Sequence, residues 1–251
     1  MAYPHLLFIN FTEVNLLTNQ KQSHKKIWSS LLFLGLCLLV AFGARALYTL
    51  WEDSKVDTDT LFYDALADLN EWDSYRYTLD ARLLLNNFKT AETVVSGEID
   101  TEGNLHVFGE IMDTEMEAYQ FGETHYRFNS AARKWVLLEN SPLTTNAVLL
   151  MEIEPALNFA FTETISVTYN GKESVGGDRL FQYTVVPKEG FHVADAYFTD
   201  FTYEVGVNGR TGQIEEAVIY AASRTDEQNR LEILVNFYDI NEDFVLSPPE
   251  N

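Results

Sequence analysis

Hydrophobic residues form one uninterrupted run near the start of the chain. No charged residue occurs in the eighteen positions from Ile27 to Ala44, and three lysines lie just before them, within residues 21–26. A helix of that length rises about 27 Å, close to the roughly 30 Å hydrocarbon core of a bilayer. Acidic residues follow the run. The asymmetry predicts a transmembrane helix within residues 27–50, with the tail 1–26 in the cytoplasm and the rest of the chain outside.

A cleaved signal peptide is the competing interpretation of this run, because it has a similar order of basic, apolar and small residues. The apolar core here exceeds the usual ~7–15 residues of a signal peptide. Trp28 and Trp51 also lie near its ends, where indole rings favour the headgroup region. The pattern therefore favours an uncleaved signal anchor. For residues 1–26, a small interfacial tail and a true start further downstream both stay open.

After a short polar linker, 51–59, apolar positions recur at helical spacing. They predict an amphipathic helix that Asp57 or Thr58 caps. The apolar positions are Leu61, Phe62, Ala65, Leu66, Leu69 and Trp72. From Tyr75 to Leu85 the pattern changes to strict alternation, which predicts a long strand.

Most of the remaining chain alternates in the same way, and turn sequences separate the alternating segments. Predicted strands cover about 93–100, 104–112, 115–121, 124–129, 134–139, 164–169, 179–186, 201–207, 213–221 and 230–238. Asn170-Gly171 and Asn208-Gly209 are typical of tight turns. A second helix is predicted around residues 148–157, stopped or kinked by Pro155. Short connections join antiparallel neighbours. The fold class is therefore α+β, with one large curved antiparallel sheet of about 10–11 strands and two packed helices.

Charge and composition limit the classes of partner that the protein can bind. The chain has a net charge of −21, and its first 51 residues carry four basic side chains and one acidic one, so the remainder carries −24. Such a domain is repelled by nucleic acid and by anionic polymers. With 46% hydrophobic and 14% aromatic residues, residues 60–251 can bury the core of a single domain. The sole cysteine, Cys37, lies in the apolar run, so no disulfide is expected outside it.

Motifs for catalysis and cofactors are missing from the sequence. There is no Gly-x-Ser-x-Gly, phosphate loop or dinucleotide fingerprint. After the apolar run, histidine occurs only at positions 106, 125 and 192. Nucleophilic chemistry needs a Ser or Cys beside an oriented His, and zinc needs clustered His or Cys ligands. We therefore expect no enzyme, no cofactor and no metal site.

One segment near the C-terminus resembles a calcium loop. Asp239, Asn241, Asp243 and Glu250 stand at positions 1, 3, 5 and 12 of such a loop. Its sharp turn requires Gly at position 6, where this chain has Phe244. A strand end with solvated acidic residues is therefore the favoured interpretation.

Four stretches resemble the LolA/LprG-like lipoprotein-carrier superfamily. The first is Tyr126-Arg127-Phe128 followed by Lys134-Trp135-Val136, and the second is Ser141-Pro142-Leu143. The third runs from Val167-Thr168-Tyr169-Asn170-Gly171 through Gly176-Gly177 to Phe181-Gln182-Tyr183-Thr184-Val185. The fourth is Val207-Asn208-Gly209-Arg210-Thr211-Gly212-Gln213-Ile214 with the later Phe237-Tyr238-Asp239-Ile240-Asn241.

This likeness covers roughly residues 60–247. It implies a half-barrel sheet wrapped around helices, with an apolar concavity able to hold an acyl chain or a hydrophobic peptide. Two features depart from the family pattern. Asn208 stands where Asp is usual, and the predicted anchor is a helix rather than a lipid-modified cysteine.

These observations and the resemblance together predict a non-catalytic binding module, anchored in a bacterial cytoplasmic membrane with its domain outside the cytoplasm. The module is expected to hold a lipid or hydrophobic segment. The alternative is a protein-interaction or sensor module of the cell envelope without a small ligand. Strand periodicity alone does not decide which face of the sheet is concave. The candidate cavity-lining residues are Leu79, Leu83, Phe128, Trp135, Val167, Phe181, Tyr183, Val218 and Phe237.

Overall fold

The structure is a computed structural model that describes residues 39–40, 42–44, 56–86, 88–112, 114–138, 153–160, 163–189 and 194–250. The chain divides into two compact units, Met1–Val56 and Asp57–Asn251. In the first unit the described residues are Leu39–Val40 and Phe42–Ala44, which are helical, and Val56, which is not. Most of the predicted transmembrane segment 27–50 lies outside the described residues and stays a prediction. None of the helices in the described part of the chain has the length and hydropathy to cross a membrane.

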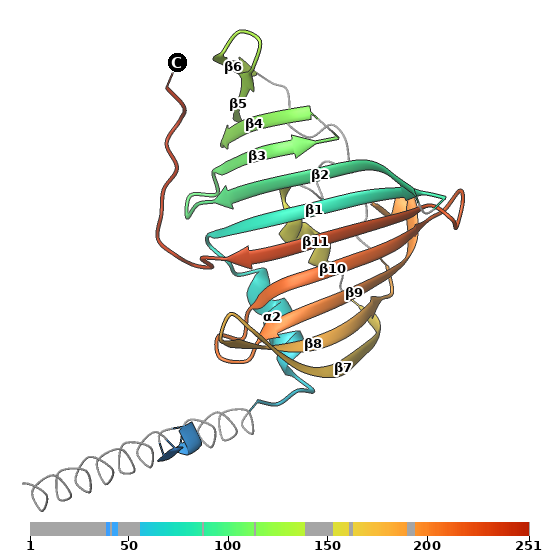
Figure 1. Cartoon of the computed structure of the whole chain (residues 1–251). Helices are drawn as coiled ribbons and strands as arrows, with labels where there is room; N and C mark the ends of the chain where they lie inside the picture. The colour runs from blue at the N-terminus through green and yellow to red at the C-terminus, as the bar shows by residue number, and fades with distance from the viewer. Residues whose placement is uncertain are drawn as a thin grey trace, which may run out of the picture. The chain divides into compact units, whose positions relative to one another are not determined.

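The second unit is built on one antiparallel sheet with a leading helix (Figure 1). The helix is α2 (Leu61–Leu69), and two short 3₁₀ helices are η1 (Pro155–Phe159) and η2 (Ala194–Ala196). The strands are β1 (Tyr75–Leu85), β2 (Phe88–Ile99), β3 (Leu105–Ile111), β4 (Thr114–Phe121), β5 (Thr124–Asn129), β6 (Lys134–Leu138), β7 (Thr164–Val175), β8 (Asp178–Pro187), β9 (Phe198–Asn208), β10 (Ile214–Ser223) and β11 (Arg230–Tyr238).

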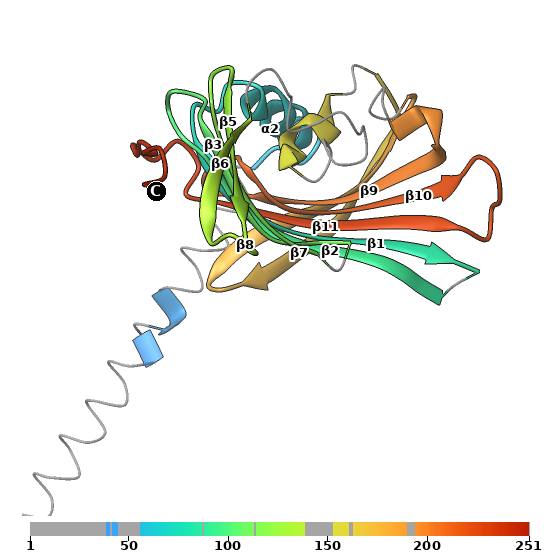
Figure 2. The same ribbon diagram turned by 90° about the horizontal axis from the view of Figure 1, so that it is seen from above.

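The eleven strands are ordered β6-β5-β4-β3-β2-β1-β11-β10-β9-β8-β7. Each half is therefore a meander of sequential neighbours, and the pair β1–β11 joins the two halves. Figure 2 shows that the sheet curves and that α2 lies on its concave side. Strands β1–β6 are termed the arm, and the two sides of the sheet are termed the concave face and the convex face. The predicted curved antiparallel sheet is confirmed.

Helix α2 begins differently from the prediction. Its N-cap is Thr60, which makes no side-chain capping bond, so neither Asp57 nor Thr58 caps it. The Asp57 carboxylate instead accepts a bond from the backbone N–H of Asp59 at 3.0 Å, which forms a turn ahead of the helix. The apolar stripe is as expected, because Phe62, Ala65 and Leu69 are its buried residues.

The turn predicted at Asn170-Gly171 is wrong. β7 continues through these residues to Val175, and its pairing with β8 shifts register between Tyr169 and Gly171. Gly171 has φ +113°, so the conformational freedom of glycine serves a β-bulge within the strand. The chain turns instead at Gly176-Gly177, where both φ angles are again positive.

The turn predicted at Asn208-Gly209 is confirmed. Asn208 N donates to the Gln213 carbonyl and Gly212 N donates to the Asn208 carbonyl, both at 2.8 Å. The Asn208 side-chain oxygen also accepts the backbone N–H of Arg210 at 2.8 Å. A carboxylate oxygen would serve equally as acceptor, so Asn fulfils the turn role of the usual Asp.

The second predicted helix is described only in part, because residues 139–152 lie outside the described residues. Ile153 is helical, and Pro155 begins the short helix η1 rather than only ending the preceding one. Proline suits a first helical position, since its missing N–H has no partner there in any case.

The segment after β11 packs against the start of β1 and the β2–β3 turn. Arg76 donates to Asp239 at 2.7 Å and to Glu98 at 3.0 Å, and its guanidinium lies 4.1 Å from the centre of the Phe244 ring. Asn241 accepts the backbone N–H of Asp73 at 2.9 Å. Two of the acidic and amide groups of the calcium-like segment therefore make structural contacts.

Candidate functional site

The concave face of the sheet is apolar across its central strands. Tyr77 of β1 pairs with Phe237 of β11 and with Gly97 of β2, and Leu79 pairs with Val235 and Val95. Because side chains alternate along a strand, each of these rows stands on one face. Their side chains are at most 3% exposed. The middle of the concave face is thus a packed core.

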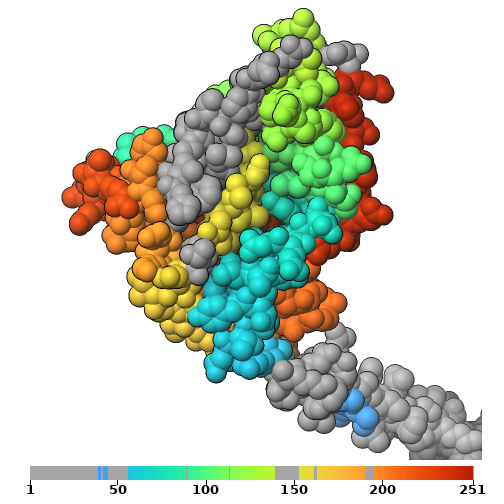
Figure 3. Space-filling view, turned by 180° about the vertical axis from the view of Figure 1, so that it is seen from behind, coloured from blue at the N-terminus to red at the C-terminus, as the bar shows by residue number. Residues whose placement is uncertain are grey.

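Three tyrosines tie the chain that covers this face to the sheet. Tyr203 donates its hydroxyl to the carbonyl of Asn158 at 2.9 Å, and Tyr183 donates to Thr58 at 3.0 Å. Tyr77 donates to the carbonyl of Ile153. Desolvation raises the pKa of Tyr183 to about 12, so its hydroxyl stays protonated as a donor at neutral pH. Figure 3 shows η1 in yellow near the middle of this face and α2 in cyan below it.

The described helices cover only part of the concave face. Eleven strands at about 4.8 Å spacing extend roughly 50 Å, whereas a nine-residue helix is about 13.5 Å long and 10 Å wide. Within the arm, the concave face carries both buried apolar residues, such as Leu105, Val107 and Ala118, and half-buried ones. The half-buried residues together are termed the half-buried row. They are Leu83, Ile99, Ile111, Met116, Val136 and Leu138. This half-buried row is the surface on which an apolar molecule could lie.

The nine predicted lining residues do not share one face. Strand register places Leu79, Leu83, Val167, Phe181, Tyr183 and Phe237 on the concave face. Phe128, Trp135 and Val218 pair in register with convex residues and lie on the other face. Whether the first six line an open cavity stays a prediction.

Sequence reasoning missed two kinds of concave residue. Val235 and Ile233 are central to the face, and Met116 lies in its half-buried row. Val235 and Ile233 flank Leu234, and this run of three apolar residues shows no alternation of apolar and polar positions. Only the pairing of β11 with β1 shows which of the three point inward.

The arm carries an aromatic cluster on its convex face. The imidazole of His106 stacks on Tyr119, with centroids 4.0 Å apart, and Trp135 meets Tyr119 edge-on at 5.3 Å. Both ring nitrogens of His106 face carboxylates, Glu98 at 3.1 Å and Glu117 at 3.2 Å. Trp135 also packs on Phe128 at 5.3 Å. These two predicted lining residues therefore help to hold β3–β6 together by cross-strand packing.

His125 lies apart from this cluster, on the concave side of the arm, where it pairs with Gln120 and Leu138. His192 lies outside the described residues.

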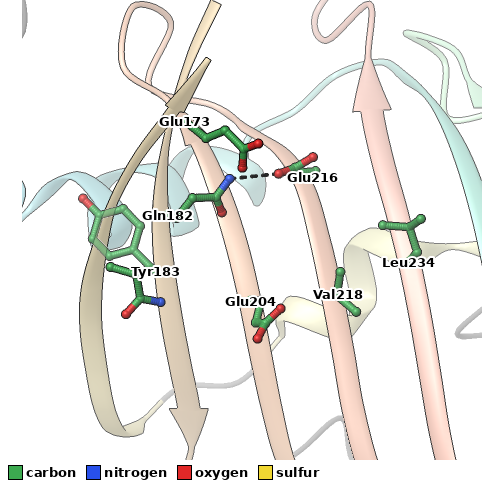
Figure 4. A pocket seen from close by; sticks show the side chains of 8 residues that line it. Glu173, Gln182, Tyr183, Glu204, Glu216, Val218 and Leu234 are labelled. Carbon is green, nitrogen blue, oxygen red and sulfur yellow. Dashed lines mark hydrogen bonds between the residues drawn. The ribbon is translucent and has the colours of Figure 1, made fainter. Parts of the chain in front are cut away.

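A separate depression of about 370 Å³ opens on the convex face beside β7–β11 (Figure 4). Its polar lining includes Glu173, Glu204 and Glu216, and Gln182 donates to Glu216 at 2.9 Å. Val218 and Leu234 form its apolar side. Predicted residue Val218 is thus part of this depression and not of the concave face.

The fold resembles several solved structures of bacterial proteins. Over 78% of this chain and 99% of the other, it superposes on LprF from Mycobacterium bovis with a TM-score of 0.51 and 10% sequence identity. Lipoprotein LppX from Mycobacterium tuberculosis gives a TM-score of 0.49 and 11% identity, covering 76% of this chain and 100% of that one. A LolA superfamily protein from Nitrosomonas europaea gives 0.33 and 11%, covering 76% and 96%.

The predicted LolA/LprG-like fold is therefore confirmed. At these identities the likeness concerns the fold alone. No family model matches the sequence, and no curated protein matches it either.

Proposed function

We propose that this chain is a non-catalytic binding module that holds a lipid tail or another hydrophobic segment against the concave face of its arm. The observation that carries the proposal is the set of half-buried apolar residues on the concave face of the arm, which includes Leu83, Met116 and Leu138. An apolar surface of this kind favours contact with a molecule that removes it from water. The LolA/LprG-like fold supports the proposal by providing a curved sheet with one apolar side.

The energetics of an acyl ligand are favourable. Each buried methylene contributes about 0.8 kcal/mol, so ten contribute about 8 kcal/mol. Loss of translational and rotational freedom costs at least ~4 kcal/mol. Burial of a single alkyl chain could therefore suffice for measurable binding without any charged contact.

Organic extraction of purified residues 57–251, followed by mass spectrometry, tests the proposal directly. This unit contains the entire sheet. We expect about one lipid or other apolar molecule per chain. Repeated recovery of empty protein that also fails to take up added lipid would favour the interaction or sensor module instead.

Met116→Lys is expected to weaken binding of a fluorescent fatty acid at least tenfold, or by about 1.4 kcal/mol. Met116 belongs to the half-buried concave row, and a lysine there would place a charge where the alkyl chain should lie. Titration of the probe, monitored by its emission, measures the effect.

Glu115→Lys is the matched control. Glu115 is the preceding residue of β4, is exposed, and by alternation faces the convex side. It should leave probe binding within about twofold, since it alters no apolar contact. Equal losses in the two variants would contradict binding on the concave face.

Residues 27–50 are proposed to anchor the module at the outer side of the bacterial cytoplasmic membrane. The uncharged run and its basic flank support this orientation. A periplasmic-type reporter enzyme fused after Asn251 should be active, while a reporter that functions only in the cytoplasm should be silent. The reverse result would refute the orientation.

A further inference from the structure

The convex face of β8–β11 contains the depression described above. α2 lies on the opposite side of the sheet (Figure 2). The depression forms where Gly206 lies between Gln182 and Glu216 on neighbouring strands. A Cβ atom at Gly206 would approach Glu216 Cγ to 2.7 Å. Because glycine has no side chain, the sheet surface is hollowed at this position.

The carboxylates around the depression have no cationic partner within the described part of the chain. No basic side chain of the described residues forms an ion pair with Glu173, Glu204 or Glu216. The neighbouring strand β1 does carry arginines on this face, but Arg76 is paired with Glu98 and Asp239, and Arg82 with Asp80 and Glu92. Among the described residues, no basic side chain therefore balances the negative charge of the depression.

This negative charge affects a nearby side chain. Tyr220 lies on the same face and its hydroxyl hydrogen-bonds to Glu204. Burial raises its pKa above the ordinary value, and the charges of Glu204 and Glu232 raise it further. The hydroxyl stays protonated and remains a donor, so it does not neutralise the carboxylate.

An apolar strip borders these acids. Val218 and Leu234 are paired neighbours on β10 and β11, and Leu234 is 38% exposed. The aliphatic stem of a lysine or arginine can pack on such a strip while its charged end reaches a carboxylate. The carboxylates and the apolar strip can therefore contact the same lysine or arginine side chain, the first through its charged end and the second through its stem.

The spacing of the acids argues against a bare metal ion. Among the described residues, no three His, Cys, Asp or Glu side chains lie close enough to hold a metal. A single exposed ion pair contributes only about 0–1 kcal/mol. Stable occupancy therefore needs several cationic groups with apolar contacts between them, which a segment of another protein provides.

We propose that Glu173, Glu204, Glu216, Val218 and Leu234 form a docking face for a partner-protein segment that presents lysine or arginine side chains beside apolar ones. Charge complementarity selects this partner, and the exposed strip adds apolar contact. The inference goes beyond the proposed ligand binding, because it concerns the opposite face of the sheet.

The test uses the full chain in mild detergent and a fluorescent decapeptide of alternating leucine and lysine, with empty micelles as reference. Glu204→Gln/Glu216→Gln should weaken peptide binding at least tenfold, because both substitutions remove charge without changing side-chain shape. Raising the salt from about 0.05 to 0.5 M should also weaken it. The same peptide with glutamine for every lysine should bind no more than weakly.

Glu123→Gln/Glu227→Gln is the matched control, since it removes the same net charge from two exposed turns. It should change binding less than about threefold. Equal weakening by both pairs would show attraction to diffuse negative charge and overturn the docking face. Unchanged binding in Glu204→Gln/Glu216→Gln, or equal binding of the glutamine peptide, would overturn it too. Fatty-acid binding on the concave face is independent of either result.

Discussion

Replacing Phe237 by alanine is expected to lower the free energy of unfolding by about 4 kcal/mol. The ring is 3% exposed on the concave face. It packs edge-on against Trp72 at 5.2 Å and Tyr75 at 5.8 Å between ring centres, and against Phe159 of η1 at 6.1 Å. Truncation removes burial and leaves a cavity among three rings that belong to separate segments. Since domains are stable by only ~5–15 kcal/mol, the loss should be large.

Urea unfolding monitored by circular dichroism measures this loss as a lower midpoint at unchanged slope. Tyr238→Ala is the matched control, because Tyr238 is the next residue, is also aromatic, and is 41% exposed. It should cost less than about 1 kcal/mol. Similar losses for both variants would contradict the assignment of the two faces. A large loss confined to Phe237→Ala would mark this predicted lining residue as a member of the packed core.

Gly97→Val is expected to destabilise the protein by about 3 kcal/mol or more. A Cβ atom at Gly97 would overlap the ring of Tyr77, its partner on β1. Tyr77 is fully buried and its hydroxyl is held by the Ile153 carbonyl, so the ring has no free space into which it can move. The close approach of ring and backbone therefore requires glycine, although Gly97 does not have a positive φ.

Thermal and urea unfolding of Gly97→Val should be compared with Ser96→Val, the preceding residue on the convex face. Valine suits a strand, so Ser96→Val should change stability by no more than about 0.5 kcal/mol. In a Tyr77→Ala background, Gly97→Val should cost much less, because the overlapping ring is gone. An undiminished cost in that background would show that the ring overlap is not the cause.

The local elements were largely predictable because alternation and helical spacing are local patterns. Strand β1 was expected over residues 75–85 and occupies Tyr75–Leu85. The Asn208-Gly209 turn was also predictable, since side-chain and backbone bonds within a few residues stabilise it. Asn170-Gly171 has the same local signal but lies in a bulge. Pairing between β7 and β8 continues past it, which the local sequence does not reveal.

The site was less predictable because it depends on contacts between distant segments. Val218 and Trp135 look like lining residues by composition, yet both lie on the convex face. The contrast between the buried middle of the concave face and its half-buried row also depends on where α2 and η1 lie. The acidic docking face combines residues from β7 to β11 that no motif connects.

By itself, the sequence determined the antiparallel strands, the leading amphipathic helix, the strong negative charge and the LolA/LprG-like fold. The strands and the helix follow from the local spacing of apolar residues, the charge follows from composition, and the fold likeness follows from the order of the motifs. Only the tertiary structure decided the pairing of β1 with β11, and with it which alternate residues face inward. The physical reason is that a strand has two equivalent sides until its neighbours and the covering helices bury one of them.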